Sequence, residues 1–264
     1  MANSDVANYL SNLEKDHPNW VALRDAISYY EGAESRSADL HHSERIETTN
    51  SLLGFPKSQE SRAADIGCNW GIFTFKLAEM GYKTVAVDVY SRVFTEILVP
   101  VSEMIGLRGS IETYVGYGED LPFANGFFEL VVCGEVIEHV KNPSIFLKEM
   151  NRILEDEGIL VLSTPNGEAD AKRLFSHLGL FTNPEHEKEY SLNELEKFIK
   201  EAGFEIVDTK FINPDIFPFV HLLDDRVMLY RRLIYAPVRA LCVKLPSLSK
   251  RLASGIVVKC KKVN

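Results

Sequence analysis

Seven short apolar runs, separated by segments with helical spacing, constrain the fold of this sequence more than any other feature. Between residues 63 and 211 the runs are AADIG, TVAVDV, IETYVG, FELVVCG, GILVLSTP and FEIVDTKF, and GIVVKCKK follows at 255–262. Strands that alternate with helices form parallel βαβ units, and helices then cover both faces of the sheet. The pattern therefore predicts an α/β fold with a mostly parallel seven-stranded sheet.

Helices are predicted in the intervals between these runs. Their expected ranges are 71–80, 91–106, 143–154 and 191–202. Two of them begin with a recognisable N-terminal signal. Asn142 is a suitable N-cap because Pro143 follows at the first helical position. Ser191 has Glu194 three residues later, which is the spacing of a capping box.

The chain divides into one core with an addition on either side. A length of 264 residues and an apolar fraction of 45% suit a single globular α/β domain with appendages. We expect a helical lead-in over 1–60, a core over 61–210 and a last strand with the tail over 255–264. Residues 211–254 then form a helical insertion before the last strand, broken by prolines into short pieces.

The N-terminal sequence and the cysteines favour a cytoplasmic protein. The first 20 residues lack a basic segment followed by an apolar one, and no uncharged stretch is long enough for a spanning helix. The four cysteines have no CxxC spacing. This arrangement suits a reducing compartment and argues against a disulfide framework or a zinc knuckle.

Charge is distributed very unevenly along the chain. All 38 acidic residues lie within 1–225, so this part carries a formal charge of −19, whereas 226–264 carries +10. An acidic body argues against broad nucleic-acid binding. Basic residues among Leu, Ile, Val and Tyr in 211–254 suit peripheral contact with an anionic membrane. The alternatives are a helical lid over an apolar pocket, or pairing of the basic tail with the acidic body.

The first apolar run ends in a glycine-containing loop, ADIGCNWG, that has the features of a ligand site. Glycine lets the backbone approach a ligand closely, and the free amides of the helix that follows favour an anion. The second run ends at Asp88, 21 residues after Gly67, where a carboxylate can bind the hydroxyls of a ribose. A dinucleotide-binding enzyme would have glycine in place of Asn69, so that class is disfavoured.

This loop resembles motif I of the class I S-adenosylmethionine-dependent methyltransferases. The stretch from GYGEDLPF through EVIEHV to STPN is similar to the small-molecule branch of that family, including ubiquinone biosynthesis enzymes, and the likeness covers about 63–210. It implies a Rossmann-like class I methyltransferase fold with S-adenosylmethionine as cofactor. The residues that it places at the cofactor are Asp65, Gly67, Cys68, Asn69, Gly71, Asp88, Val89, Gly118, Glu119, Asp120, Glu135 and Val136. Tyr117 is a departure, because an acidic residue is common there.

A cluster of acidic residues and a histidine follows the fourth run. Glu135, Glu138 and His139 lie at i, i+3 and i+4, so a helical turn starting at Glu135 would bring them to one side. Such a set suits Mg²⁺ or another divalent metal. The spacing also resembles two metal-assisted branches of the family, the ubiquinone O-methyltransferases and the small-RNA 2′-O-methyltransferases. The RNA branch has a later histidine as fourth ligand, and His186 is similarly placed.

The alternative for this cluster is that no ion binds. His139 would then be the catalytic base, with Glu135 beside it at the cofactor, because an imidazole exchanges protons near neutral pH.

The predicted function is methyl transfer, to oxygen, on a small and apolar acceptor such as a quinone precursor, an isoprenoid or a lipid-like molecule. An RNA 2′-O-methyltransferase is the second hypothesis, which the ExxEH pattern with His186 supports and the acidic body opposes. A third is a module that binds S-adenosylmethionine without catalysis.

Overall fold

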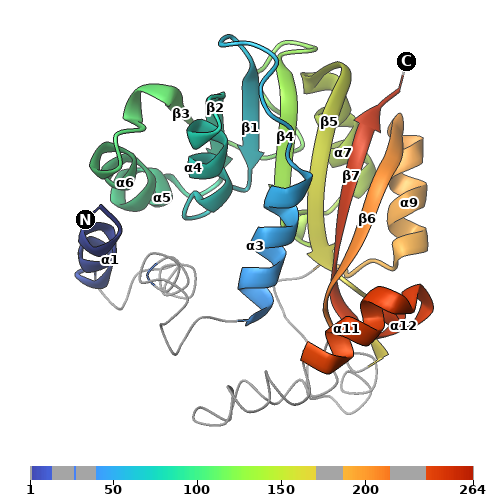
Figure 1. Cartoon of the computed structure of the whole chain (residues 1–264). Helices are drawn as coiled ribbons and strands as arrows, with labels where there is room; N and C mark the ends of the chain where they lie inside the picture. Colours follow the sequence, from blue (N-terminus) through green and yellow to red (C-terminus); the bar gives the residue numbers. More distant parts are fainter. Residues whose placement is uncertain (1, 14–26, 28–39, 171–186, 215–235, 264) are drawn as a thin grey trace.

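A computed structural model describes residues 2–13, 27, 40–170, 187–214 and 236–263, and a seven-stranded sheet lies at its centre (Figure 1). The strands are β1 (Arg62–Ile66), β2 (Lys83–Asp88), β3 (Ile111–Val115), β4 (Phe128–Gly134), β5 (Leu154–Pro165), β6 (Phe204–Pro214) and β7 (Ala253–Lys262). Their order is β3-β2-β1-β4-β5-β7-β6. β7 is antiparallel to both of its neighbours, β5 and β6, and the other pairs of strands are parallel. The predicted Rossmann-like, mostly parallel sheet is confirmed.

Helices precede the first strand and separate most of the others. They are α1 (Ala2–Ser11), α3 (Leu40–Leu52), α4 (Ile72–Glu79), α5 (Ser91–Val93), α6 (Val99–Met104), α7 (Pro143–Ile153), α9 (Leu192–Glu201), α11 (Ala236–Lys244) and α12 (Pro246–Leu252). A π-helical turn, Phe94–Leu98, joins α5 to α6, so the helix predicted near 91–106 is one helical segment with a wider turn. Short 3₁₀ turns occupy Arg108–Ser110 and Ile137–His139.

Alternation along the strands divides the core between the two faces of the sheet. In β1, Ala63 packs in one cluster with side chains of α1, α3, α4 and α6, whereas Ala64 and Ile66 pack in the other with α7 and α9. Successive strand residues point to opposite faces, so nearly continuous apolar runs are what a sheet covered on both sides requires. The two layers of helices are visible in Figure 1.

Both predicted helix starts are present. The Asn142 side chain accepts a hydrogen bond from the Ile145 amide at 3.1 Å, with Pro143 in the first turn of α7. At the start of α9 the Ser191 hydroxyl accepts from the Glu194 amide, and the Glu194 carboxylate accepts from the Ser191 amide. These bonds satisfy amides that have no partner within the helix.

The sixth strand is longer than its apolar pattern indicates. β6 continues to Pro214, which pairs with Ala253, and so extends into the range expected for the insertion. β6 pairs with β7 along its whole length, so the hydrogen bonds between the two strands, and not the alternation of side chains, determine where β6 ends. Helices α11 and α12 lie within the predicted insertion. In the part of the chain that the structure describes, no helix has the length and apolar character to cross a membrane.

Candidate functional site

The candidate site lies where the strand order reverses. The chain progresses from β1 outward to β2 and β3 on one side, and then returns to place β4 on the other side of β1. In open α/β sheets, ligands bind beside the carboxyl ends of the strands at this reversal. Gly67 follows β1, Asp88 ends β2 and Gly134 ends β4, so three of the segments singled out from the sequence meet at this edge.

Gly67 is required by a close approach within the protein itself. Its φ is +71°, and a Cβ atom there would lie 2.4 Å from the Cγ2 atom of Val136. The amides of Gly67 and Cys68 both donate to the Val87 carbonyl, at 2.8 and 2.9 Å. The loop is therefore held between β2 and the turn that follows β4, and a side chain at Gly67 would force the two apart.

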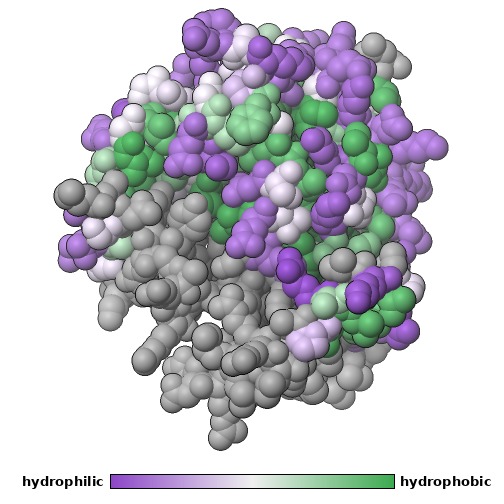
Figure 2. Space-filling view, in the orientation of Figure 1, coloured by the Kyte–Doolittle hydropathy of each residue, from purple (hydrophilic) through white to green (hydrophobic). Residues whose placement is uncertain are grey.

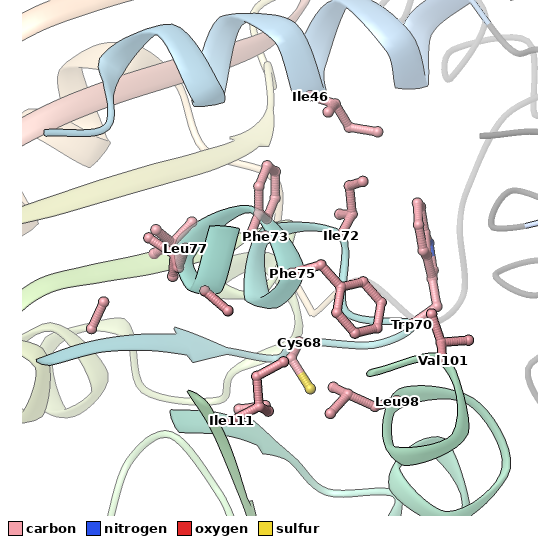
Figure 3. Close-up of a cluster of buried hydrophobic side chains, with 14 of the residues drawn as sticks. Ile46, Cys68, Trp70, Ile72, Phe73, Phe75, Leu77, Leu98, Val101 and Ile111 are labelled. Atoms are coloured by element: carbon pink, nitrogen blue, oxygen red, sulfur yellow. The ribbon is translucent and has the colours of Figure 1, made fainter. Parts of the chain in front are cut away.

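Two other loop residues anchor it in the core. The side chains of Cys68 and Trp70 are buried in the cluster shown in Figure 3, where they pack with Phe75, Leu98 and Val101. Burial raises the pKa of the Cys68 thiol well above its ordinary value. Cys68, which the resemblance places at the cofactor, thus directs its side chain into the core and leaves only its backbone for a ligand.

Asp65 supports the loop from below. Its carboxylate is buried, accepts a hydrogen bond from the Thr74 hydroxyl at 2.7 Å, and also accepts one from the Thr74 backbone. These donors belong to the first turn of α4, whose positive end favours a carboxylate. Burial nevertheless raises the pKa of Asp65 to about 7.

Asp88 presents a carboxylate at the end of β2. Its Oδ2 atom accepts from the Asn69 amide at 2.9 Å and its Oδ1 atom from the Tyr90 amide at 3.0 Å. Burial raises its pKa, although these amides act in the opposite direction. A carboxylate has about four acceptor positions, so both oxygens can also accept from the hydroxyls of a ribose.

Exposed side chains with apolar surface follow the ends of β2 and β3, next to Asp88. Val89, Tyr90 and Tyr117 are 42%, 60% and 71% exposed. Tyr117 follows β3, which pairs with β2, and the Gly116 amide donates to the Asp88 carbonyl directly after that ladder. Apolar side chains left uncovered beside one carboxylate suit a flat heterocycle carried on a ribose.

Gly118, Glu119 and Asp120 form the next part of the same edge. A Cβ atom at Gly118 would lie 2.6 Å from the Phe146 ring of α7, so only glycine fits. Glu119 is half-buried and Asp120 is exposed. The Asp120 amide donates to the Tyr117 carbonyl at 3.2 Å, which closes a turn there.

Glu135, Glu138 and His139 do not converge as the spacing predicted. The short helical turn begins at Ile137 rather than at Glu135, whose φ of +58° directs the chain differently. Glu138 is fully buried, whereas His139 is exposed. In the regions that the structure describes, no three His, Cys, Asp or Glu side chains gather into a possible metal site. His186, the fourth candidate ligand, lies outside the described residues.

Each of the two glutamates instead contacts β5. The Glu135 Oε1 atom accepts from the Ser163 hydroxyl at 3.1 Å, and the Glu138 Oε2 atom accepts from Thr164 at 3.0 Å. Burial, and then the charge of Glu135, raise the pKa of Glu138 well above its ordinary value. Burial and the neighbouring carboxylate therefore both favour the protonated form of Glu138.

Arg45 is a residue at this edge that sequence analysis missed. It projects from α3 over the Phe73 ring, 5.8 Å from the ring centroid, and its Nη1 atom lies 3.0 Å from the position of a Cβ on Gly134. Burial raises the pKa values of Asp65 and Glu138, and the positive charge of Arg45 opposes this rise at both carboxyls. No motif marks Arg45, because its neighbours at the site lie in distant parts of the chain.

Comparisons with known proteins agree with this geometry. A family model described as a methyltransferase domain matches residues 40–209. The ubiquinone biosynthesis O-methyltransferase of Xanthomonas oryzae pv. oryzae is 33% identical over 109 residues, which are 40% of this chain and 44% of that protein. The mitochondrial ubiquinone biosynthesis O-methyltransferase of Schizosaccharomyces pombe is 31% identical over 160 residues, 55% of this chain and 56% of that one. The chain thus matches about half the length of these relatives.

A solved structure of geranyl diphosphate methyltransferase in complex with SAM has the same fold. Its TM-score is 0.62 at 16% identity, over 97% of this chain and 94% of that one. A likeness at this identity shows the fold alone. Since the family model covers more than half of the sequence, this chain belongs to the methyltransferase domain family and has the fold of the class I S-adenosylmethionine-dependent methyltransferases.

Proposed function

We propose that this protein transfers a methyl group from S-adenosylmethionine to an oxygen of a small, apolar acceptor such as a quinone precursor, an isoprenoid or a lipid-like molecule. The observation that carries the proposal is the Asp88 carboxylate, which lies beside the glycine loop among exposed apolar side chains. Asp88 would accept hydrogen bonds from the ribose, while Val89, Tyr90 and Tyr117 would cover the adenine.

The amino-acid end of the cofactor would lie toward Gly67 and Gly134. Arg45 supplies a positive charge there, and a guanidinium binds a carboxylate through paired hydrogen bonds. Gly134 has to be glycine, because a Cβ would also lie 2.7 Å from the Phe73 ring. Arg45 of α3 and Phe73 of α4 therefore both lie against Gly134.

The protein's own contribution to the reaction would be positioning and proton removal. S-adenosylmethionine, when bound, supplies an electrophilic methyl group on a sulfonium that leaves as a neutral thioether. The fold would hold the acceptor oxygen in line with that methyl group, which makes the encounter effectively intramolecular. His139, exposed on the turn after β4, would take the proton of the acceptor hydroxyl.

The names of similar proteins support the choice of acceptor. Two are ubiquinone biosynthesis O-methyltransferases and one is a geranyl diphosphate methyltransferase, and the first two names specify transfer to oxygen. A divalent ion is not part of the proposal, because burial of Glu138 and exposure of His139 do not fit a shared set of ligands.

Methylation assays with radiolabelled S-adenosylmethionine test the proposal. Wild-type protein, Asp88→Asn and the control Asp208→Asn, on the edge strand β6, are each incubated with a prenylated catechol, a total lipid extract and small RNA. We expect label in the catechol or in the lipid fraction with wild type and with the control. We expect at least about tenfold less with Asp88→Asn at limiting cofactor, since a charged hydrogen bond contributes roughly 1.5–3 kcal/mol.

Other outcomes identify the rival functions. Label in RNA alone would favour the RNA 2′-O-methyltransferase. Binding of S-adenosylhomocysteine by calorimetry, without label in any acceptor, would favour a module that holds the cofactor. Equal affinity of wild type and Asp88→Asn for S-adenosylhomocysteine would contradict the placement of the ribose.

A further inference from the structure

The loop between β3 and β4 is held by two side chains of α7 that lie outside the candidate site. Arg152 and Glu149 form an ion pair in which the Nε and Nη2 atoms of the guanidinium each contact one carboxylate oxygen at 2.7 Å. Such two-point pairing fixes the orientation of both groups. The Glu149 side chain is only 12% exposed, and the pair holds the pKa of its carboxyl below the ordinary value.

The same two side chains also bind the backbone of the loop. Glu149 accepts from the Leu121 amide at 2.8 Å, while the Arg152 Nη2 atom donates to the Leu121 carbonyl at 2.9 Å. The Arg152 Nη1 atom donates to the Phe123 carbonyl at 2.7 Å and to the Asn125 side chain at 2.9 Å. Leu121 is buried, so both of its backbone polar groups need partners, and the pair supplies both.

Residues 117–120 lie between this attachment and another one. On the other side, the Gly116 amide donates to the carbonyl of Asp88 at 3.0 Å. These four residues are thus attached at one end to β2 and at the other end to α7. Between the two ends, Gly118 packs against Phe146, which precedes Glu149 on α7 by one turn. A segment fixed at both ends loses little further entropy when a ligand binds.

We infer that Glu149 and Arg152 are positioning residues for the cofactor, which act by holding residues 117–120 in place to receive the adenosine. This inference rests on the proposed function, because it takes the ligand of that segment to be the adenosine half of S-adenosylmethionine. Neither side chain needs to touch the cofactor. The pair sets the affinity for the adenosine half, while the acceptor and the proton transfer are left to other parts of the site.

Five variants distinguish a role in positioning the cofactor from an effect on the stability of the whole fold. Arg152→Met and Glu149→Met remove the contacts. Arg152→Lys keeps the charge but not the planar fork, and Glu149→Gln keeps an acceptor for the Leu121 amide. Lys57→Met is the control, since it breaks the ion pair with Glu155 at the opposite end of the sheet.

Affinity is measured by calorimetry for S-adenosylhomocysteine and for 5′-methylthioadenosine, which lacks the amino-acid end. We expect both methionine variants to weaken the two ligands by a similar factor of about ten, because several hydrogen bonds of roughly 1 kcal/mol each are lost. Arg152→Lys should lie between these variants and wild type, and Glu149→Gln should recover most of the affinity. At saturating cofactor, kcat and the KM for the acceptor should not change.

Hydrogen exchange of the amides in 117–121, measured without ligand, gives a readout that does not depend on the cofactor. Faster exchange in Arg152→Met than in Lys57→Met is expected. Equal exchange, or unchanged affinity for both ligands in the methionine variants, would overturn the inference. A wild-type protein that binds neither ligand would instead overturn the proposed function, and exchange would still show whether the pair orders this segment.

Discussion

Asp65 shows how one residue can satisfy a motif and still have a role different from the expected one. The sequence placed it at the cofactor, in the loop that resembles motif I. In the structure its carboxyl is buried beneath the loop and bonded to Thr74, so it orients the start of α4. At the residue scale, the motif marks the position of the site, while burial determines which side chains can face a ligand.

Burial of this carboxyl has a consequence for stability. The folded-state pKa of about 7 lies above the ordinary 3.8, so between these values the folded protein keeps a proton that the unfolded chain has lost. The contribution of the Asp65 carboxyl to the free energy of unfolding is fully present below about pH 4 and is lost as the pH rises toward 7. Asp65→Asn, which keeps an acceptor for Thr74, removes this dependence. We therefore expect the variant to gain stability relative to wild type by a few kcal/mol between pH 4 and pH 8, at ~1.4 kcal/mol per unit of pKa shift.

Denaturant unfolding of both proteins across this range measures the difference. Groups that titrate alike in the two proteins make no contribution to the difference in their free energies of unfolding. The change of this difference with pH therefore reports on Asp65 alone. A constant difference between wild type and variant at all pH values would mean that Asp65 is ionised in the folded protein.

At the scale of elements, the turn after β4 shows where spacing misleads. Three residues at i, i+3 and i+4 share a side only within an α-helix that has already begun. Here Glu135 adopts φ +58° and the helical turn starts two residues later, so Glu138 enters the core and His139 faces outward. The helix starts at Asn142 and Ser191 were predicted correctly, because a cap depends only on residues within one turn.

Chelation tests the consequence for a metal. Because Glu138 is buried against Thr164 and His139 is exposed, we expect methyl transfer to continue in the presence of a chelator, at a rate within about twofold of the untreated protein. The assay compares protein dialysed against the chelator with the same sample after addition of Mg²⁺ or Mn²⁺. Loss of turnover on chelation, with recovery on addition of either ion, would support a metal site formed by Glu135, Glu138, His139 and His186.

At the scale of the whole molecule, basic residues of the C-terminal part form ion pairs with acidic residues of the body. In the part of 226–264 that the structure describes, Arg239 pairs with Glu44, Lys250 with Glu168 and Arg251 with Asp170. The ion pairs attach α11 and α12 to α3 and to the segment after β5. Pairing of the tail with the acidic body was one of the alternatives considered for the sequence, and these contacts support it.

Part of this surface still suits an anionic membrane. Leu241 and Leu245 are each 46% exposed, and the exposed Lys244 lies next to them. Figure 2 shows hydrophobic colour beside hydrophilic colour over α11 and α12. Each cation near an anionic leaflet contributes about 1 kcal/mol, within a screening length of about 8 Å. We therefore expect weak, salt-sensitive binding to anionic liposomes.

Flotation with liposomes measures this binding. Leu241→Gln combined with Leu245→Gln should remain with the soluble fraction, while Phe55→Gln, at an exposed residue before β1, should float like wild type. A wild-type protein that does not float at any anionic content would leave α11 and α12 as a packed flank.

The sequence by itself determined the succession of strands and helices along the chain, the two helix caps and the glycine loop with Asp88. Each of these depends on periodicity or on chemistry within a few residues. The tertiary structure decided what those patterns leave open. Arg45 reaches Gly134 across 89 positions of sequence, and Arg152 reaches Leu121 across 31. Contacts between distant segments leave no local pattern, since they arise only when the sheet brings α3, α7 and the strand ends together. For the same reason, packing against β5 and not spacing determined that Glu138 is buried and His139 exposed.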